Sequence, residues 1–332
     1  MTQPPGSGAA SPVTLDDVRA ARRLIAGIAV RTPLKGCDAL GERIGGAVHL
    51  KIETMQPTGA FKVRGAANRL LQLSPEERRR GVITVSTGNH GRAVAYVARR
   101  LGIRCVVCLS SLVPANKVAA IRALGAELDV GGENQDAAMD RAEGRALAEG
   151  LVMVSPFDDP AIIAGQGTIA LEILEDVADA GTIVVPLSGG GLAAGVAVAA
   201  KALRPSLRVV AIGSERCPAM LRSLEAGRPV AVAEHESLAD SLGGGIGLAN
   251  RFTLALVGEF VDEIRVVGEA AIAAAMRFAF HEARLVVEGA AAVPIAALHA
   301  ARFGEFPSPI VAVITGDNVE PDRLLAILRA AA

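Results

Sequence analysis

Apolar and polar residues follow two regular patterns along most of the chain. Short runs rich in Val and Ile predict buried strands, whereas longer stretches with apolar residues three or four positions apart predict helices. From residue 81 onwards the two kinds of segment alternate. The predicted strands are 48–52, 82–86, 103–109, 127–130, 152–154, 182–187, 207–212, 263–267 and 310–314, and the predicted helices are 14–24, 63–71, 93–101, 114–125, 134–149, 161–177, 192–203, 269–282, 288–299 and 321–331.

This alternation implies parallel sheets with helices on both faces. Pro156 and Pro160 separate two such sets of elements. We therefore expect an α/β fold with two lobes of twisted parallel sheet flanked by helices, and an active site in the cleft between the lobes. The expected divisions are a disordered tail over residues 1–14, a large domain built from 15–66 and 157–332, and a small domain built from 67–156.

Composition narrows the class of protein. Apolar residues make up 51% of the 332 residues, aromatic residues only 3%, and tryptophan is absent, so Ala, Val, Leu and Ile must form the core. The net charge is −1 and no basic block is present, which argues against a nucleic-acid partner. Neither a signal peptide nor an apolar run of membrane-spanning length is visible. We expect a soluble cytoplasmic protein with no membrane partner.

The spacing of two cysteines suggests a metal-binding or redox role, but their surroundings argue against it. Cys105 and Cys108 are spaced like a metal-binding or redox pair, but they lie inside the apolar run 103–109. Residues three apart on a strand point to opposite faces of the sheet. We interpret both as small buried hydrophobic residues.

Lys62 is the first candidate for catalysis. Only five of the 34 basic residues are lysines, so each lysine is worth explaining. Lys62 lies between Phe61 and Val63, where a turn leads into a predicted helix. An amine that is partly desolvated in such a place can lose its proton and attack a carbonyl group. The alternative is an ordinary surface lysine in a first helical turn.

Three segments that combine glycine with polar residues each follow a predicted strand: 86–91, 188–191 and 314–318. Ligands of open parallel sheets bind at this carboxyl edge. In the second segment, Ser188 and three glycines precede a helix, so converging backbone N–H groups and the helix dipole would form a phosphate cradle. A plain tight turn is one alternative. A dinucleotide site is another, because Gly189 and Gly195 fit a glycine-rich pattern and Glu215 follows the next strand.

A phosphate cradle and an imine-forming lysine together indicate pyridoxal 5′-phosphate. This cofactor needs an amine for its aldehyde, donors for its phosphate, a donor for its ring oxygen and a partner for its ring nitrogen. Lys62, the segment 188–191, Asn89 and Thr315 could supply these in turn.

Four motifs then carry a family resemblance. G-A-F-K-V-R-G-A from residue 59 resembles the S-F-K-x-R-G-A motif of the threonine dehydratase and serine racemase group, within the fold type II enzymes of the tryptophan synthase β superfamily. S-T-G-N-H-G, S-G-G-G-L and I-T-G-D-N-V-E resemble further motifs of that group, in the same order. The resemblance runs from about Leu15 to the C-terminus.

The resemblance implies roles for individual residues. Lys62 would bind the cofactor covalently and later act as the base. Phe61 would pack beside the ring, Asn89 would bind the ring oxygen, and Glu288 would lie near the cofactor, although a helix-capping role for Glu288 is an alternative. Thr315 would meet the ring nitrogen. The phosphate would be held by Ser188, Gly189, Gly190 and Gly191, and the substrate carboxylate by Ser86, Thr87 and His90.

Departures from the family pattern bear on the expected reaction and on the expected metal content. Ala60 replaces the usual serine of the lysine motif, and Thr87 stands where a racemase has the serine that reprotonates the opposite face. Threonine is stiffer and bulkier than serine, which disfavours racemisation. The Thr315 hydroxyl cannot keep the ring nitrogen protonated as a carboxylate would, which favours a reaction whose β-leaving group departs promptly. Gly213 and Ala219 stand where some relatives bind a divalent cation, so we expect no metal site there.

The expected reaction is dehydration and deamination of a β-hydroxy amino acid such as L-threonine or L-serine. Residues 241–247 and the nearby Arg251 form a candidate specificity loop, although Arg251 also fits a solvated surface position. This loop and the overall pattern are somewhat similar to the hydroxyectoine-utilisation dehydratases, which would imply a substrate with a larger polar tail. The alternatives are an amino-acid racemase with the same cofactor and a dinucleotide-binding protein. The resemblance also implies a homodimer.

Overall fold

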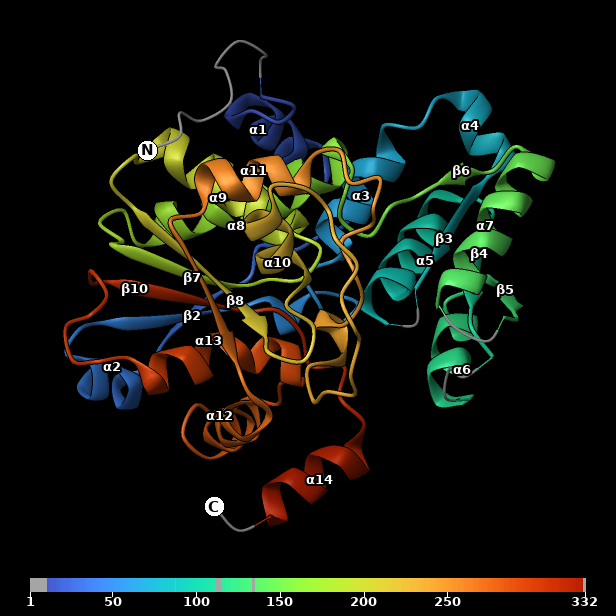
Figure 1. The fold of residues 1–332 in the computed structure, drawn as a ribbon. Coiled ribbons are helices and arrows are strands. Elements are labelled where there is room, and N and C mark those ends of the chain that lie inside the picture. The colour runs from blue at the N-terminus through green and yellow to red at the C-terminus, as the bar shows by residue number, and fades with distance from the viewer. Residues whose placement is uncertain (1–10, 87, 112–114, 133–134, 331–332) are drawn as a thin grey trace.

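The computed structural model describes residues 11–86, 88–111, 115–132 and 135–330. Strands and helices alternate along the chain and build two sheets, so the expected α/β architecture is confirmed (Figure 1). The helices are α1 (Leu15–Leu24), α2 (Asp38–Ile44), α3 (Val63–Leu71), α4 (Pro75–Arg80), α5 (Asn89–Leu101), α6 (Ala115–Ala123), α7 (Gln135–Glu149), α8 (Pro160–Asp176), α9 (Gly191–Leu203), α10 (Ala219–Ala226), α11 (Thr253–Phe260), α12 (Glu269–His281), α13 (Gly289–Ala300) and α14 (Pro321–Arg329).

The larger sheet has six strands in the order β1-β2-β10-β7-β8-β9. All neighbouring pairs are parallel except β1 with β2, which is antiparallel at the edge. The strands are β1 (Leu34–Gly36), β2 (Val48–Ile52), β7 (Thr182–Pro186), β8 (Arg208–Ser214), β9 (Glu263–Val267) and β10 (Ile310–Ile314). The central strands β7 and β10 are buried along their whole length, as parallel strands between two helical layers must be.

The smaller sheet has four parallel strands in the order β5-β4-β3-β6. They are β3 (Val82–Val85), β4 (Cys105–Leu109), β5 (Glu127–Val130) and β6 (Val152–Met153). Cys105 and Cys108 are free and buried, and they belong to core clusters on opposite faces of this sheet, as the strand spacing predicts.

The two faces of the larger sheet carry separate hydrophobic clusters. Val311 and Val313 of β10 face the cluster under α1, α8 and α9, whereas Ala312 and Ile314 face the cluster under α12 and α13. Full burial of one Val or Ile side chain contributes about 1.5–3 kcal/mol. The sheet is therefore a rigid base, and the loops at the carboxyl ends of its strands are held in place.

The structure also corrects the expected elements. Residues 1–10 of the expected disordered tail lie outside the described residues, but Val13 is buried and Thr14 caps α1, so the tail does not extend to residue 14. The helix after β3 begins at Asn89 rather than at residue 93. The short elements β1, α2, α4, α10 and α11 were not predicted. Across the described ranges, no helix has the length and apolar character that a membrane crossing requires.

Candidate active site

Lys62 lies immediately before α3, in a turn that is fastened to the end of β10. The backbone N–H of Phe61 donates to the carbonyl oxygen of Thr315 at 3.0 Å, and Ala60 forms a β-bridge with Gly316. Gly59 has a φ of +70°, and a side chain there would overlap the Asp317 carboxylate, so only glycine fits. The lysine motif and the β10 motif are thus brought together as the sequence predicts.

The environment of the Lys62 amine differs from that of a solvated surface lysine. Its Nζ atom donates to the carbonyl oxygen of Pro156 at 2.7 Å and lies 5.3 Å from the centroid of the Phe61 ring. Burial lowers the pKa of Lys62 from 10.5 to about 8, against the opposing effect of the negatively charged Glu288. A substantial fraction of this amine is therefore neutral, and nucleophilic, near pH 8.

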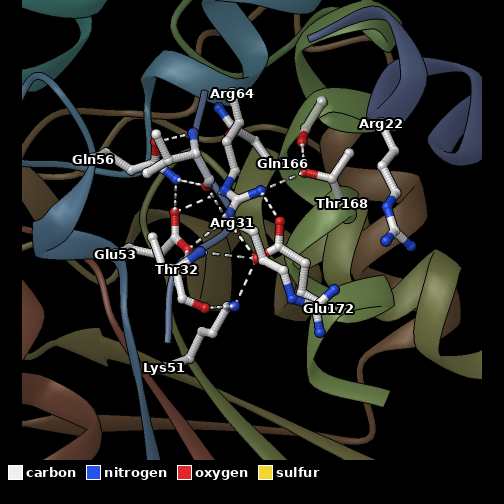
Figure 2. A network of polar contacts seen from close by, with 12 residues as sticks. Arg22, Arg31, Thr32, Lys51, Glu53, Gln56, Arg64, Gln166, Thr168 and Glu172 are labelled. Carbon is white, nitrogen blue, oxygen red and sulfur yellow. Dashed lines mark hydrogen bonds and ion pairs between the residues drawn. The ribbon is translucent and has the colours of Figure 1, made fainter. Parts of the chain in front are cut away.

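A buried network of charged side chains anchors α3 just after Lys62 (Figure 2). Arg64 is only 1% exposed and donates to the carboxylates of both Glu53 and Glu172, with four N–O distances of 2.7–2.8 Å. Lys51, on β2, donates to Glu172 at 2.6 Å and is fully buried. Two positive and two negative side chains thus balance one another.

This balance fixes the position of the lysine turn. Burial acts to raise the pKa of Glu172, but Arg64 and Lys51 together hold it below its usual value. Because Glu172 belongs to α8 and Glu53 to the 3₁₀ turn Glu53–Met55, Arg64 joins three segments at one point. A buried charge left without its partner is costly, so the network strongly resists displacement of α3.

A chain of amide and carboxylate groups crosses from the smaller sheet to the larger one. Asn89 Nδ2 donates to Glu288 Oε1 at 2.7 Å, and Asn89 Oδ1 accepts from Asn318 Nδ2 at 2.6 Å. Asn318 also donates to the carbonyl oxygen of Thr58 and accepts from Arg92. These contacts fix the direction of the Asn89 amide, and its Nδ2 group keeps a second hydrogen that can be donated to a ligand.

Glu288 is buried at the N-cap position of α13, directly beside this chain of contacts. Its backbone N–H donates to Gly316 at 3.1 Å, but its side chain makes no capping hydrogen bond within α13. Its carboxylate instead binds Asn89 and acts electrostatically on Lys62. The simple helix-capping interpretation of this residue is therefore wrong.

Of the remaining expected substrate residues, Ser86 precedes α5 and His90 is the second residue of that helix. Ser86 Oγ accepts from the backbone N–H of Gly88 at 3.3 Å. His90 is buried, its Nε2 lies 3.2 Å from the carbonyl oxygen of Val154, and its Nδ1 has no partner in the described part of the chain. Burial, together with the charge of Lys62, lowers the pKa of His90 to about 3, so the ring is neutral. Thr87, the expected catalytic and substrate-binding residue, lies outside the described residues.

The neutral state of His90 restricts what its side chain can bind. Because Nε2 faces a carbonyl oxygen, it must carry the ring hydrogen, which leaves Nδ1 as an acceptor. An acceptor repels a carboxylate. Any contribution of His90 to carboxylate binding must therefore come from its backbone N–H.

The glycine segment after β7 forms an open N-terminus for α9. Gly190 has a φ of +91°, and a Cβ atom there would lie 2.6 Å from Met220 and 3.0 Å from Thr253. A side chain at Gly189 would overlap the Phe157 ring. Within the described ranges, no protein group accepts a hydrogen bond from the backbone N–H of Gly189, Gly190 or Gly191. These donors and the helix dipole suit a phosphate group.

Two features of the site were missed by sequence reasoning. The sequence marks Pro156 only as a boundary, but the segment Pro156–Asp158 binds Lys62 through Pro156 and packs Phe157 on the glycine segment. Asn318 was quoted in a motif but given no role, although it orients Asn89. The position of Asn318 three residues after Thr315, at the carboxyl edge of a central strand, was an available signal.

The other expectations concern residues farther from Lys62. Gly213 lies in β8 and Ala219 begins α10, and neither side chain has an atom that could bind a metal. Arg251 is exposed, and its guanidinium lies 4.9 Å from the centroid of the Phe252 ring. Glu215, the acid of the dinucleotide alternative, is exposed.

Comparison with known proteins agrees with this geometry. The chain is 48% identical over 310 residues to a putative threonine dehydratase of Sinorhizobium fredii, covering 93% of each protein. It is 39% identical over 316 residues to an L-threonine ammonia-lyase of Thermotoga maritima, covering 95% of this chain and 78% of that protein. The structure of maize serine racemase superposes with a TM-score of 0.89 at 31% identity, covering 95% of this chain and 96% of that one.

A family model matches nearly the whole folded chain. The match extends over residues 25–316, which include Lys62, Asn89, the glycine segment, Glu288 and Thr315. The family resemblance of the sequence motifs is therefore confirmed, and the dinucleotide alternative is set aside. The chain belongs to the family of pyridoxal-phosphate dependent enzymes.

Proposed function

We propose that this enzyme dehydrates and deaminates L-threonine or L-serine, giving a 2-oxo acid and ammonia. One observation carries the proposal: the desolvated Lys62 amine, with a pKa of about 8, lies between the Phe61 ring and the Pro156 carbonyl. An amine in this state can act both as a nucleophile and as a base. The names of the similar proteins, a threonine dehydratase and a threonine ammonia-lyase, support this choice of reaction.

The residues present fit pyridoxal 5′-phosphate. The cradle Ser188–Gly191 offers backbone N–H groups at Gly189–Gly191 for which the described residues provide no acceptor, and Phe157 and Met220 pack so closely on Gly189 and Gly190 that neither position can carry a side chain. We assign the ring oxygen to Asn89, whose amide is already oriented. We assign the ring nitrogen to Thr315, which is 2% exposed at the end of β10, and the ring face to Phe61.

When bound at Lys62, the cofactor supplies an electron sink for loss of the substrate α-proton. Lys62, once displaced by the substrate amine, takes that proton. Thr315 presents an uncharged hydroxyl rather than a carboxylate, so a prompt departure of the β-hydroxyl is favoured over a reaction that holds negative charge at the α-carbon for long. Ser86, Thr87 and the backbone of His90 are proposed to bind the substrate carboxylate.

A racemase is the second candidate. It is supported by the similarity to maize serine racemase, whose reaction needs a proton donor on the face opposite Lys62. We propose that Thr87, which replaces a serine at that position, serves this role poorly. Racemisation would change the chirality of the substrate without releasing ammonia.

Finer features are proposed on the same basis. The residues 15–66 and 157–332 would form the large domain and 67–156 the small one, because the first set contains every strand of the six-stranded sheet and the second every strand of the four-stranded sheet. The active site would lie in the cleft between the two domains. The loop 241–247 with Arg251 would select the substrate side chain, and a hydroxyectoine-derived amino acid is one proposed substrate. A cytoplasmic homodimer is the proposed working form.

The test is a parallel assay of 2-oxo acid and ammonia from L-threonine, L-serine, 3-hydroxyaspartate and a hydroxylated 2,4-diaminobutyrate. Equal amounts of the two products from threonine or serine support the proposal, and preferential release from the diamino compound supports the hydroxyectoine subgroup. Chiral analysis of the remaining substrate detects racemisation. Lys62→Ala is the control, and product release by Lys62→Ala at the wild-type rate would contradict the proposed function.

A further inference from the structure

We propose that Asp158 is a positioning residue that holds the phosphate cradle in its binding geometry. This inference rests on the proposed function, because it takes the glycine segment 188–191 to be the phosphate site. It goes beyond that function in assigning a role to a carboxylate that touches neither the glycine segment nor Lys62 directly.

The Asp158 carboxylate binds three consecutive backbone N–H groups. Oδ2 accepts from Arg251 at 2.7 Å, and Oδ1 accepts from Phe252 and Thr253 at 2.9 Å each. These groups form the N-terminus of α11, whose own N-cap residue makes no side-chain capping bond. Asp158 therefore caps a helix that begins 95 residues later in the chain, together with Asn250, whose Oδ1 accepts from the N–H of Leu254 at 3.0 Å.

Helix α11 packs directly on the glycine segment. Thr253 and Val257, on its first two turns, lie 3.0 and 3.2 Å from the position that a Cβ atom of Gly190 would occupy. On the other side, the Phe157 ring covers Gly189, and the Phe157 backbone lies 2.8–2.9 Å from a Cβ position at Gly191. The glycine segment is thus enclosed between Phe157 and α11.

Asp158 connects the two sides of the glycine segment, because it follows Phe157 in the chain and also binds α11. Ser155 Oγ accepts from the N–H groups of both Phe157 and Asp158, which shapes the short segment that presents them. Pro156, in the same segment, accepts the hydrogen bond of Lys62. A single segment therefore sets the distance between the lysine and the cradle.

The charge of Asp158 also decides which helix can receive the phosphate. The first N–H groups of α11 are occupied by the carboxylate, whereas those of α9 at Gly189–Gly191 have no acceptor within the described ranges. An anion is therefore directed to α9. Asn at position 158 would lose the charge, and its amide nitrogen would face the N–H of Arg251, donor against donor.

The experiment compares Asp158→Asn with the wild-type protein in the binding of two probes to the full-length apoprotein, pyridoxal 5′-phosphate and pyridoxal. Asp159→Asn is the matched control. Asp159 is one residue away, caps α8 through Ala161 and Ile162 and forms an ion pair with Arg69 at 3.1 Å, so its replacement by Asn removes the same charge from the same segment without touching α11. Pyridoxal lacks the phosphate and reports on the lysine side of the site alone.

We expect Asp158→Asn to bind pyridoxal 5′-phosphate roughly tenfold more weakly, the scale at which residues that orient a ligand-binding group act. Pyridoxal binding should stay unchanged, and Asp159→Asn should leave the affinity ratio of the two probes at the wild-type value. Hydrogen exchange of the apoprotein should become faster at the amides of residues 251–253 in Asp158→Asn.

Faster exchange at residues 251–253 with an unchanged affinity ratio would overturn the inference, since Asp158 would then be only a helix cap. An equal loss of affinity for both probes would also overturn it. A wild-type protein that fails to bind pyridoxal 5′-phosphate would instead refute the proposed function, so the two failures are distinguishable.

Discussion

Replacing Lys62 with methionine is expected to stabilise the cofactor-free protein at pH 7. The reason is that folding places the Lys62 amine where its pKa falls from 10.5 to about 8. At pH 7 the amine is protonated in both states, and the folded state bears the cost of desolvating its charge. Methionine fills a similar volume with no charge.

The magnitude follows from the two pKa values. Their difference of about 2.5 means that the protonated amine lowers the unfolding free energy of the wild-type protein by about 3 kcal/mol at pH 7, and the methionine variant avoids this cost. The variant loses the hydrogen bond to Pro156, which lowers its unfolding free energy by about 1.5–3 kcal/mol, as is typical for a charged donor. The net stabilisation should be about 1 kcal/mol.

The pH dependence is the sharper test. Between pH 8 and 10.5 the unfolded state binds more protons at Lys62 than the folded state, so the stability of the wild-type protein rises with pH in this window. Between pH 7 and pH 9.5, the unfolding free energy of the wild-type protein should therefore rise by about 2 kcal/mol relative to that of Lys62→Met.

Urea unfolding of both apoproteins at pH 7, 8.5 and 9.5 measures this shift. Lys201→Met is the control, because Lys201 forms an ion pair with Asp262 at 2.7 Å and its loss should destabilise the protein. A stability difference for Lys62→Met that stays constant from pH 7 to 9.5 would refute the assigned environment of the amine.

Three further substitutions test other parts of the site. Arg64→Lys should lower the unfolding free energy by about 2–4 kcal/mol in urea titrations, because lysine cannot bind both buried carboxylates in a bidentate manner. Glu288→Gln should move the acid limb of the kcat profile to lower pH, because the Lys62 amine is free only after the substrate has bound and the negative charge of Glu288 raises its pKa; a shift to higher pH would argue against this pairing. Gly189→Ala should weaken pyridoxal 5′-phosphate binding at least about tenfold by overlap with the Phe157 ring, and adding Phe157→Ala should recover part of the affinity.

The long elements of the fold were predictable because their apolar residues repeat with the period of the structure that buries them. Strand β10, for example, reads as an uninterrupted apolar run and is fully buried. Short elements such as α11 carry no such repeat. Its first N–H groups are bound by Asp158, a residue far away in the chain, and a contact of this kind leaves no local pattern; the local cap Asn250, which accepts from Leu254, was the available signal.

The same distinction applies to the site. Lys62, the glycine segment and Thr315 could be predicted because each stands at a turn after an apolar strand or before a helix. The buried network around Arg64 could not, because Lys51 and Glu172 are 121 residues apart and each resembles an ordinary charged residue of an amphipathic element. The role of Pro156 was hidden for a related reason: its carbonyl oxygen, not its side chain, binds Lys62.

The central claim is that Lys62 is the residue that binds the cofactor. The most direct measurement is borohydride reduction of the protein loaded with pyridoxal 5′-phosphate, followed by peptide mass spectrometry. We expect a phosphopyridoxyl group on Lys62 and none on the other four lysines. Modification of Lys35, Lys51, Lys117 or Lys201 in place of Lys62, or no stable adduct in a protein that binds the cofactor, would contradict it.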